Sequence, residues 1–308
     1  MKDIFVYLIF PGFLFTVLLG MLASWLDRKI TARVQWRVGP PWYQSFADLI
    51  KLLAKETIIP RGCSRATFIL APIMGFAGVI LTSSILGMIN LNPHQGFIGD
   101  MIVVIYLLMV PALAMIMGGI ASGNALSSLG ASREMKLMIA YELPFILAAF
   151  TPVIKAGMTI DMGGLLEFQQ AHGVFLRNYS CIIAFLVALL CMQAKVGFVP
   201  FDIAEAETEI NAGPFIEYSG ALLAIFKVTK MMLLVLIPTF LLTLFAGGIG
   251  FCGWRIGASV LKYLIILLIM IVIKNTNPRL RIDQALKFFW GPVTVLALLG
   301  MVLALLGY

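Results

Sequence analysis

Long apolar segments recur along the chain, separated by short polar stretches. About 20 apolar residues cross a bilayer as a helix. On that measure the pattern predicts eight membrane-spanning helices, near residues 4–26, 67–90, 101–120, 137–157, 178–199, 221–246, 256–274 and 288–307. We therefore expect an all-α polytopic membrane protein that forms one integral-membrane domain over residues 1–308.

One shorter segment, Gln44 to Glu56, has a different pattern. Its apolar residues recur at spacings of three or four positions and include Phe46, Leu49, Ile50 and Leu53. That spacing predicts an amphipathic helix, which lies either on the membrane surface or beneath a partner subunit.

The basic residues are distributed unevenly between the two sides of the predicted bundle. Seventeen of the 22 Lys and Arg residues fall in or beside the loops after spans 1, 3, 5 and 7, and the other five are Lys2, Lys155, Arg177, Arg255 and Lys262. Cytoplasmic loops carry the excess of Lys and Arg in membrane proteins. We therefore expect these loops and the amphipathic helix in the cytoplasm, both termini outside, and a location in the cytoplasmic membrane. The net charge of +7 then reflects topology and not nucleic-acid binding.

The stretch from Lys195 to Gly220 concentrates negative charge between two predicted spans. It holds five of the 15 acidic residues, namely Asp202, Glu205, Glu207, Glu209 and Glu217. If residues 202–210 are helical, Asp202, Glu205 and Glu209 form one stripe. Repulsion between Glu205 and Glu209 should then raise at least one pKa toward neutrality, and such groups carry protons. We predict a proton-coupling site; the alternative is a solvated acidic face.

Three charged residues extend this site toward the membrane. Glu142 lies inside the predicted fourth span, where an ionisable residue is by default a functional candidate. Pro144 frees a backbone carbonyl nearby, which favours a hydrated interior over a lipid-facing or snorkelling Glu142. Lys227 and Lys230 begin the sixth span one turn apart and are placed to neutralise part of the acidic cluster.

Residues that commonly bind metals are few and scattered. Cys63, Cys181, Cys191 and Cys252 show no Cys-x-x-Cys spacing. This spacing argues against an iron–sulfur cluster and supports no disulfide framework. His94 and His172 fall in loops on the far side from the acidic stretch. The sequence thus predicts no metal site and no cofactor on this chain.

Four segments, in this order, resemble one family. They are DRKITARVQWRVGP (27–40), ADLIKLLAKE (47–56), SLGASREMKLMIAYEL (128–143) and VPFDIAEAETEINAGPFIEYSG (199–220). They are similar to the signatures of subunit 1, also called the H subunit, of respiratory complex I and of its relatives in membrane-bound hydrogenases. The third segment aligns Arg133 and Glu142 with an Arg and a Glu of that family.

Two departures favour one branch of the family. Quinone-reducing members usually read GPNRVG where this chain has GPPWYQ (39–44), and they continue with an acidic segment where this chain has AIFKVTKMM (224–232). The AEAE form with GPFIEYSG looks more like the hydrogenase-type branch, which includes energy-converting hydrogenases and formate hydrogenlyase.

The resemblance implies a membrane subunit of a redox-driven ion pump. Its cytoplasmic loops would bind a cluster-bearing small subunit and a hydrogenase-like large subunit, and antiporter-like membrane subunits would pack beside it. Ferredoxin would supply electrons, and the iron–sulfur clusters and the nickel–iron centre would lie on the partners. The acidic stretch and Glu142 would couple electron transfer to H⁺ or Na⁺ translocation, with no catalytic centre on this chain. The residues expected to dock the arm or balance the acids are Arg28, Lys29, Arg33, Arg37, Lys51, Arg133, Lys227 and Lys230.

Two other functions compete with this interpretation. The chain would be a quinone-site subunit of an NADH-quinone oxidoreductase if the quinone pocket of the family is kept. It would be a stand-alone transporter if it worked alone, which the lack of internal repeats and the large charged cytoplasmic surface disfavour.

Overall fold

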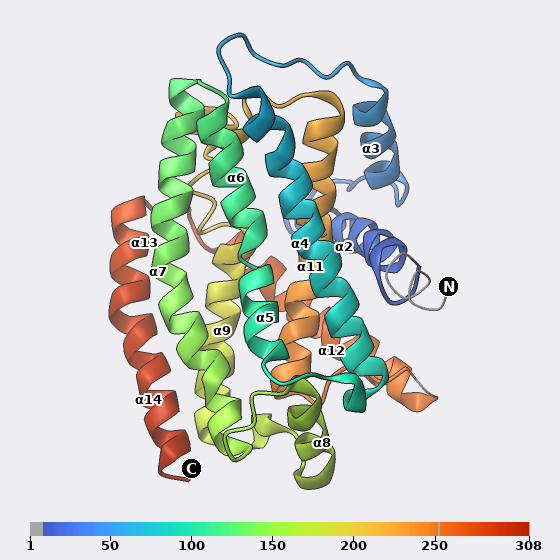
Figure 1. Ribbon diagram of the computed structural model, residues 1–308, viewed down its shortest axis with the longest axis vertical. Coiled ribbons are helices and arrows are strands. Elements are labelled where there is room, and N and C mark those ends of the chain that lie inside the picture. Colours follow the sequence, from blue (N-terminus) through green and yellow to red (C-terminus); the bar gives the residue numbers. More distant parts are fainter. Residues whose placement is uncertain (1–8, 252, 308) are drawn as a thin grey trace.

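The computed structural model describes residues 9–251 and 253–307, and only the backbone of residues 207 and 208. Over this range the regular elements are helices (Figure 1). The long ones are α2 (Phe13–Val34), α4 (Arg65–Leu91), α7 (Ala125–Lys155), α9 (Tyr179–Val196), α11 (Gly220–Phe245) and α12 (Trp254–Thr276). The short ones are α3 (Gln44–Ala54), η1 (Pro93–Gln95), α5 (Asp100–Leu107), α6 (Val110–Ala121), α8 (Met162–His172), η2 (Phe175–Arg177), α10 (Glu207–Ile210), η3 (Gly213–Phe215), α13 (Ile282–Phe288), η4 (Phe289–Val293) and α14 (Thr294–Leu305).

Seven helical segments in the described part of the chain are long and apolar enough to cross a membrane. They are Arg65–Leu91, Asp100–Ala121, Ala125–Lys155, Tyr179–Val196, Gly220–Phe245, Trp254–Thr276 and Ile282–Leu305. They follow the predicted second to eighth spans in order, which confirms the polytopic all-α class. The first predicted span begins outside the described residues, and α2 carries Asp27, Arg28 and Lys29. An eighth crossing and both termini outside stay predictions.

Three helices extend beyond the predicted spans, through polar segments that were expected to be loops. α2 ends at Val34 instead of residue 26, α7 begins at Ala125 instead of 137, and the last helical segment begins at Ile282 instead of 288. Asn124 fixes the early start of α7, since its side chain accepts a hydrogen bond from Leu126 N at 2.9 Å.

Proline interrupts two of the membrane-crossing segments. α5 ends at Leu107 and α6 begins at Val110, because Pro111 has no N–H and its ring clashes with the carbonyl of Leu107. The last segment is broken before Pro292, where Gly291 leaves helical geometry with φ −89° and ψ −105°. These breaks free backbone carbonyls inside the bundle.

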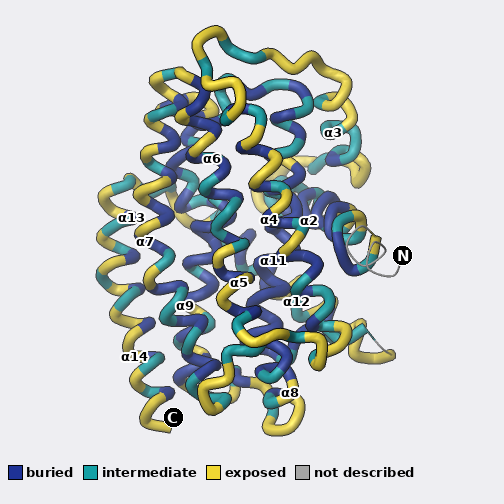
Figure 2. The backbone as a smooth tube through the Cα atoms, in the orientation of Figure 1, coloured by how far each residue is buried: buried dark blue, intermediate teal, exposed yellow. Residues whose placement is uncertain are grey.

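α11 forms the centre of the bundle. In its most apolar stretch 72% of the residues are buried, against 28% in α12, so α12 lies at the periphery. Figure 2 shows the same contrast between the buried middle and the exposed outer helix faces. Figure 1 views α2 nearly along its axis, whereas α4, α6 and α7 run along the long axis of the molecule. The tilted α2 contacts α11 at Gly20, where a Cβ would lie 2.6 Å from the carbonyl oxygen of Met231.

The connection between α9 and α11, residues 197–219, is called the acidic loop. It lies at the same end of the bundle as α3, and α8 lies at the opposite end (Figure 1). Ile58 N donates to Ser219 Oγ at 3.0 Å, and Ala221 N donates to Thr57 Oγ1 at 3.3 Å. The segment after α3 is therefore tied directly to the end of the acidic loop.

Candidate functional site

The acidic loop does not form the predicted helix over residues 202–210. Only α10 is helical there, and the preceding residues make turns. Phe201, Ile203, Ala204 and Ala206 are all buried. At about 100° per residue a helix would spread these four positions around its circumference. The turns bury all four, so the predicted stripe of Asp202, Glu205 and Glu209 is wrong.

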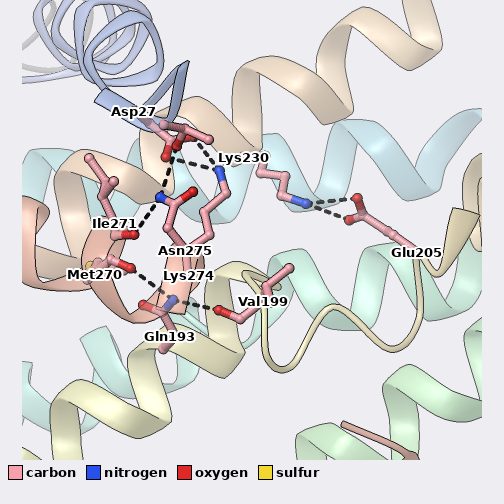
Figure 3. A network of polar contacts seen from close by, with 10 residues as sticks. Asp27, Gln193, Val199, Glu205, Lys230, Met270, Ile271, Lys274 and Asn275 are labelled. Atoms are coloured by element: carbon pink, nitrogen blue, oxygen red, sulfur yellow. Dashed lines mark hydrogen bonds and ion pairs between the residues drawn. The ribbon is translucent and has the colours of Figure 1, made fainter. Parts of the chain in front are cut away.

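Each of these three acids pairs with a base from a distant part of the chain. Arg279 donates to Asp202 at 2.6 Å, and Arg133 of α7 donates to Glu209 at 2.5 Å. Lys230 of α11 donates to both oxygens of Glu205, at 2.7 and 2.8 Å (Figure 3). The acidic loop is thus a set of ion pairs with α7, with α11 and with the connection between α12 and α13, and not an uncompensated cluster.

The pairing changes the expected pattern of pKa values. Burial raises the pKa of Asp202, with a further contribution from the neighbouring Glu205 charge that outweighs the Arg279 hydrogen bond. The hydrogen bond and charge of Arg133 lower the pKa of Glu209. The prediction expected a raised pKa at Glu205 or Glu209. The pKa of Asp202 is raised instead, whereas Arg133 favours the ionised form of Glu209.

A small cavity connects the ion pairs with the interior of the bundle. Its volume is about 50 Å³, and five charged residues line it: Glu134, Lys195, Asp202, Glu205 and Lys230. A water molecule needs about 10–15 Å³ of such space, so the cavity has room for a few. Carboxylates around a hydrated cavity can exchange protons through water.

Glu134 is a candidate residue that sequence reasoning missed. It lies in α7, is 4% exposed, and its side chain makes no hydrogen bond or ion pair with the described residues. A sequence signal existed, because helical spacing puts Glu134 on one stripe with Leu137, Tyr141 and Phe145, which are all buried. The sequence pattern predicts a loop over residues 125–136, so this helical spacing was not extended to Glu134.

Glu142 lies deeper in the bundle and pairs with Lys195 of α9. Lys195 Nζ lies 2.7 Å from Glu142 Oε1, and only 1% of the Lys195 side chain is exposed. The ammonium group also lies 4.6 Å from the ring centroid of Phe145. Because Lys195 also lines the cavity, it joins Glu142 to the acidic loop.

The remaining two acids of the stretch differ in position. Glu217 accepts a hydrogen bond from Asn124 Nδ2 at 2.6 Å and so holds the residue that caps α7. It does not line the cavity. Next to it, Tyr218 stacks on Phe68 with ring centroids 4.1 Å apart and donates to Phe68 O. Glu207 belongs to α10, and its side chain lies outside the described residues.

The predicted basic residues fall into two groups. Four of them interact within the chain: Arg133 and Lys230 with the acids, Arg28 with Asp48 at 2.8 Å, and Lys29 with Gly39 O at 3.4 Å. The other four are exposed: Arg33, Arg37, Lys51 and Lys227. Lys227 therefore does not pair with any described acid of the acidic loop, contrary to the prediction. Trp36 and Val38, which are 98% and 90% exposed, are the sequence neighbours of Arg37.

A further buried ion pair was not anticipated from the sequence. Lys274 of α12 donates to both oxygens of Asp27, at 3.0 and 2.7 Å (Figure 3). Its ammonium group also lies 4.4 Å from the ring centroid of Phe198. Asp27 is 7% exposed. This pair holds the tilted α2 against α12.

The residues described by the structure contain no group of three or more His, Cys, Asp or Glu side chains placed to hold a metal ion. Cys63, Cys181 and Cys191 are free thiols.

Seven candidate membrane spans around a network of buried charges are typical of an integral-membrane helical protein. A family model described as NADH dehydrogenase matches residues 6–305. The H subunit of NADH-quinone oxidoreductase from Thermomicrobium roseum is 34% identical over 313 residues, which cover 94% of this chain and 92% of the relative. The corresponding protein from Geobacillus kaustophilus is 31% identical over 296 residues, covering 92% of this chain and 87% of the relative.

A solved structure extends the comparison. A chain of a membrane-bound sulfane sulfur reductase, described as an archaeal respiratory membrane complex, matches with a TM-score of 0.88 and 26% identity. The match covers 99% of this chain and 100% of that chain. The chain belongs to the NADH dehydrogenase family and is an H-type membrane subunit of a complex I-like oxidoreductase complex.

Proposed function

We propose that this subunit anchors a peripheral redox arm of the hydrogenase type and couples its electron transfer to translocation of H⁺ or Na⁺ across the cytoplasmic membrane. One observation carries the proposal: Glu134 lines the same 50 Å³ cavity as Asp202, Glu205 and Lys230 of the loop ion pairs and as Lys195, which pairs with Glu142. A charge change at the loop thereby has a continuous route of charged groups into the bundle.

The groups along this route have distinct roles in the proposal. Asp202 and Glu205 receive or release protons at the loop, where burial already raises the pKa of Asp202. Glu134 exchanges protons with them through cavity water. Lys195 faces both the cavity and Glu142, so a change in the charge of Glu134 alters the field on Glu142. The redox event itself takes place on a partner, and this chain moves charge.

The exposed basic and aromatic residues beside α3 support a docking role. Arg33 in the last turn of α2 and Trp36, Arg37 and Val38 in the α2–α3 connection are exposed at the same end as the acidic loop. Exposed apolar side chains among cations are typical of an interaction surface. We propose that a cluster-bearing small subunit and a hydrogenase-like large subunit bind here, with ferredoxin as electron donor. Antiporter-like subunits would pack against the lateral helices.

Purification of the complex through a tag on this chain tests the assignment. The proposal expects co-purified partners that contain iron–sulfur clusters and nickel, and ferredoxin-linked electron transfer that builds an ion gradient in proteoliposomes. A complex that contains iron–sulfur clusters but no nickel would support the anchoring role and contradict the assignment to the hydrogenase type. A chain that purifies alone and transports ions alone would contradict both.

A quinone-site subunit is the second candidate, and the bacterial relatives favour it. Those from Thermomicrobium roseum and Geobacillus kaustophilus are both H subunits of an NADH-quinone oxidoreductase. Against it stand the two sequence departures at residues 39–44 and 224–232. Quinone bound to the purified complex, or loss of its activity with quinone-site inhibitors, would decide for this candidate.

A further inference from the structure

A large apolar cavity lies away from the acidic loop, between α2, α4, α11 and α12. Its volume is about 490 Å³, within the range of roughly 300–1,000 Å³ typical of ligand sites. Leu22, Val260 and Leu264 line it and are 39%, 52% and 39% exposed, so the cavity reaches the outer surface of the helices. This part of the surface faces hydrocarbon in a membrane.

Among the described residues of the lining, the polar side chains already have hydrogen-bond partners within the chain. Thr16, Thr239 and Tyr263 donate to backbone carbonyls at 3.0, 2.7 and 3.2 Å. Asn90 donates to Leu86 O at 2.7 Å, and Ser259 donates to Arg255 O at 2.7 Å. Apolar cavities without free polar partners exclude water. The geometry therefore selects a hydrocarbon chain over water, and also over a quinone ring, whose oxygens would need hydrogen-bond donors.

A cationic site lies at the rim of this cavity, at the start of α12. The stem of Arg255 packs on Gly250, which lines the cavity, because a Cβ on Gly250 would lie 2.7 Å from Arg255 Cβ. The Arg255 side chain is exposed and forms no ion pair with the described residues. No side chain caps the first turn of α12, and that turn contains no acidic residue. Uncapped N–H groups at a helix start attract anions such as phosphate.

An exposed aromatic residue completes this arrangement. Trp254 is 89% exposed beside Arg255. Tryptophan is enriched at the membrane–water interface, where its amphipathic ring lies at the level of lipid headgroups. The apolar cavity suits the hydrocarbon chain of a phospholipid, Arg255 suits its phosphate, and Trp254 suits the level of the headgroups.

We propose that this cavity binds a hydrocarbon chain of an anionic phospholipid, whose phosphate contacts Arg255 and the first turn of α12. The lipid fills the space that the tilt of α2 leaves between α4, α11 and α12. It therefore supports the position of α2 along the part that lines the cavity, in addition to the Asp27–Lys274 ion pair near the end of α2.

Native mass spectrometry of the purified complex tests the site, after exchange into defined phosphatidylglycerol or phosphatidylcholine. We expect one tightly retained phosphatidylglycerol in preference to phosphatidylcholine. Arg255→Gln should weaken the retention of phosphatidylglycerol about tenfold, the effect of losing one charge-assisted hydrogen bond. Arg255→Lys should restore part of it, and Val260→Trp should lower the retention of both lipids by filling the cavity.

Arg177→Gln is the matched control, because Arg177 is exposed in η2 and does not line the cavity. It should leave retention unchanged. The proposal is overturned if Arg255→Gln and Val260→Trp assemble normally and retain both lipids like the wild type. A density map that shows quinone or protein in the cavity would also overturn it.

Discussion

Lys195 Nζ lies 2.7 Å from Glu142 Oε1, and the two side chains are 1% and 12% exposed. α9 and α7 therefore hold an ion pair inside the bundle, where each charge depends on the other for compensation. Buried charges persist in membrane spans only when they are paired or hydrated. The same lysine lines the cavity below the acidic loop, so this pair is both a structural link and the inner end of the charge network.

Removing one member of this pair should be far more harmful than removing both. Lys195→Met leaves Glu142 charged and unpaired, and breaking a buried pair costs about 3–5 kcal/mol. The double variant Lys195→Met/Glu142→Met should recover most of that stability, while ion translocation stays lost. Thermal unfolding of the purified complex measures both, with Lys155→Met at the far end of α7 as the control. Equal losses in the single and double variants would contradict the pairing.

The acidic loop should depend on a glycine in α7. A Cβ on Gly130 would lie 2.7 Å from Pro214 Cδ and 3.0 Å from Gly213 Cα, both in the loop. Gly130→Ala should therefore push the loop from α7 and destabilise the complex by about 1–3 kcal/mol. Gly257→Ala in α12 is the matched control, since a Cβ there meets nothing within 4 Å and alanine favours helix. Unchanged unfolding of Gly130→Ala would argue against close packing.

Two ion pairs that connect α2 should respond differently to neutralisation. Asp27→Asn leaves Lys274 without its buried partner, and a loss of about 3 kcal/mol is expected. Asp48→Asn breaks the pair with Arg28, whose side chains are 38% and 31% exposed, and should cost at most about 1 kcal/mol. Thermal unfolding of both variants in the assembled complex gives the comparison, and a larger effect at Asp48 would contradict the assigned burial.

The loop carboxylates should give opposite pH dependences. The folded-state pKa of Asp202 is raised above its ordinary value of 3.8, so its contribution to stability falls as the pH rises above about 4. The folded-state pKa of Glu209 is lowered from 4.5, so its contribution is present above that pH and is lost as the pH falls below it. Asp202→Asn should reduce the loss of stability with rising pH, and Glu209→Gln should reduce the loss of stability with falling pH. The melting temperature between pH 3.5 and 7 checks both, with Asp283→Asn as an exposed control.

Local patterns were sufficient for part of this structure. Apolar runs of about 20 residues located seven spans, because hydropathy is a local property. The position of Glu142 inside an apolar run identified it as a candidate for the same reason. The ends of α2 and α7 were misjudged, since polar residues at helix ends remain helical when tertiary contacts or caps hold them.

The partners of the acids could not be predicted from local patterns. Arg279 and Asp202 are 77 residues apart, and Lys195 and Glu142 are 53 apart, so only the packing of helices brings them together. The loop conformation around Asp202 is also set by tertiary burial of Phe201 and Ile203. Glu134, in contrast, could have been identified from the sequence. If the predicted helix had begun at Ala125, helical spacing would have placed Glu134 on the buried face of α7.

Glu134 gives the most direct test of the account, because it is buried, lines the same cavity as the loop acids and Lys195, and has no ion-pair partner among the described residues. Glu134→Gln keeps its size and removes its proton exchange. In proteoliposomes containing the assembled complex, we measure electron transfer and the ion gradient together, with Glu56→Gln on the exposed α3–α4 connection as the control. The account predicts that electron transfer continues while the gradient falls to the level seen with an ionophore. A normal gradient at a normal rate of electron transfer in Glu134→Gln would contradict it.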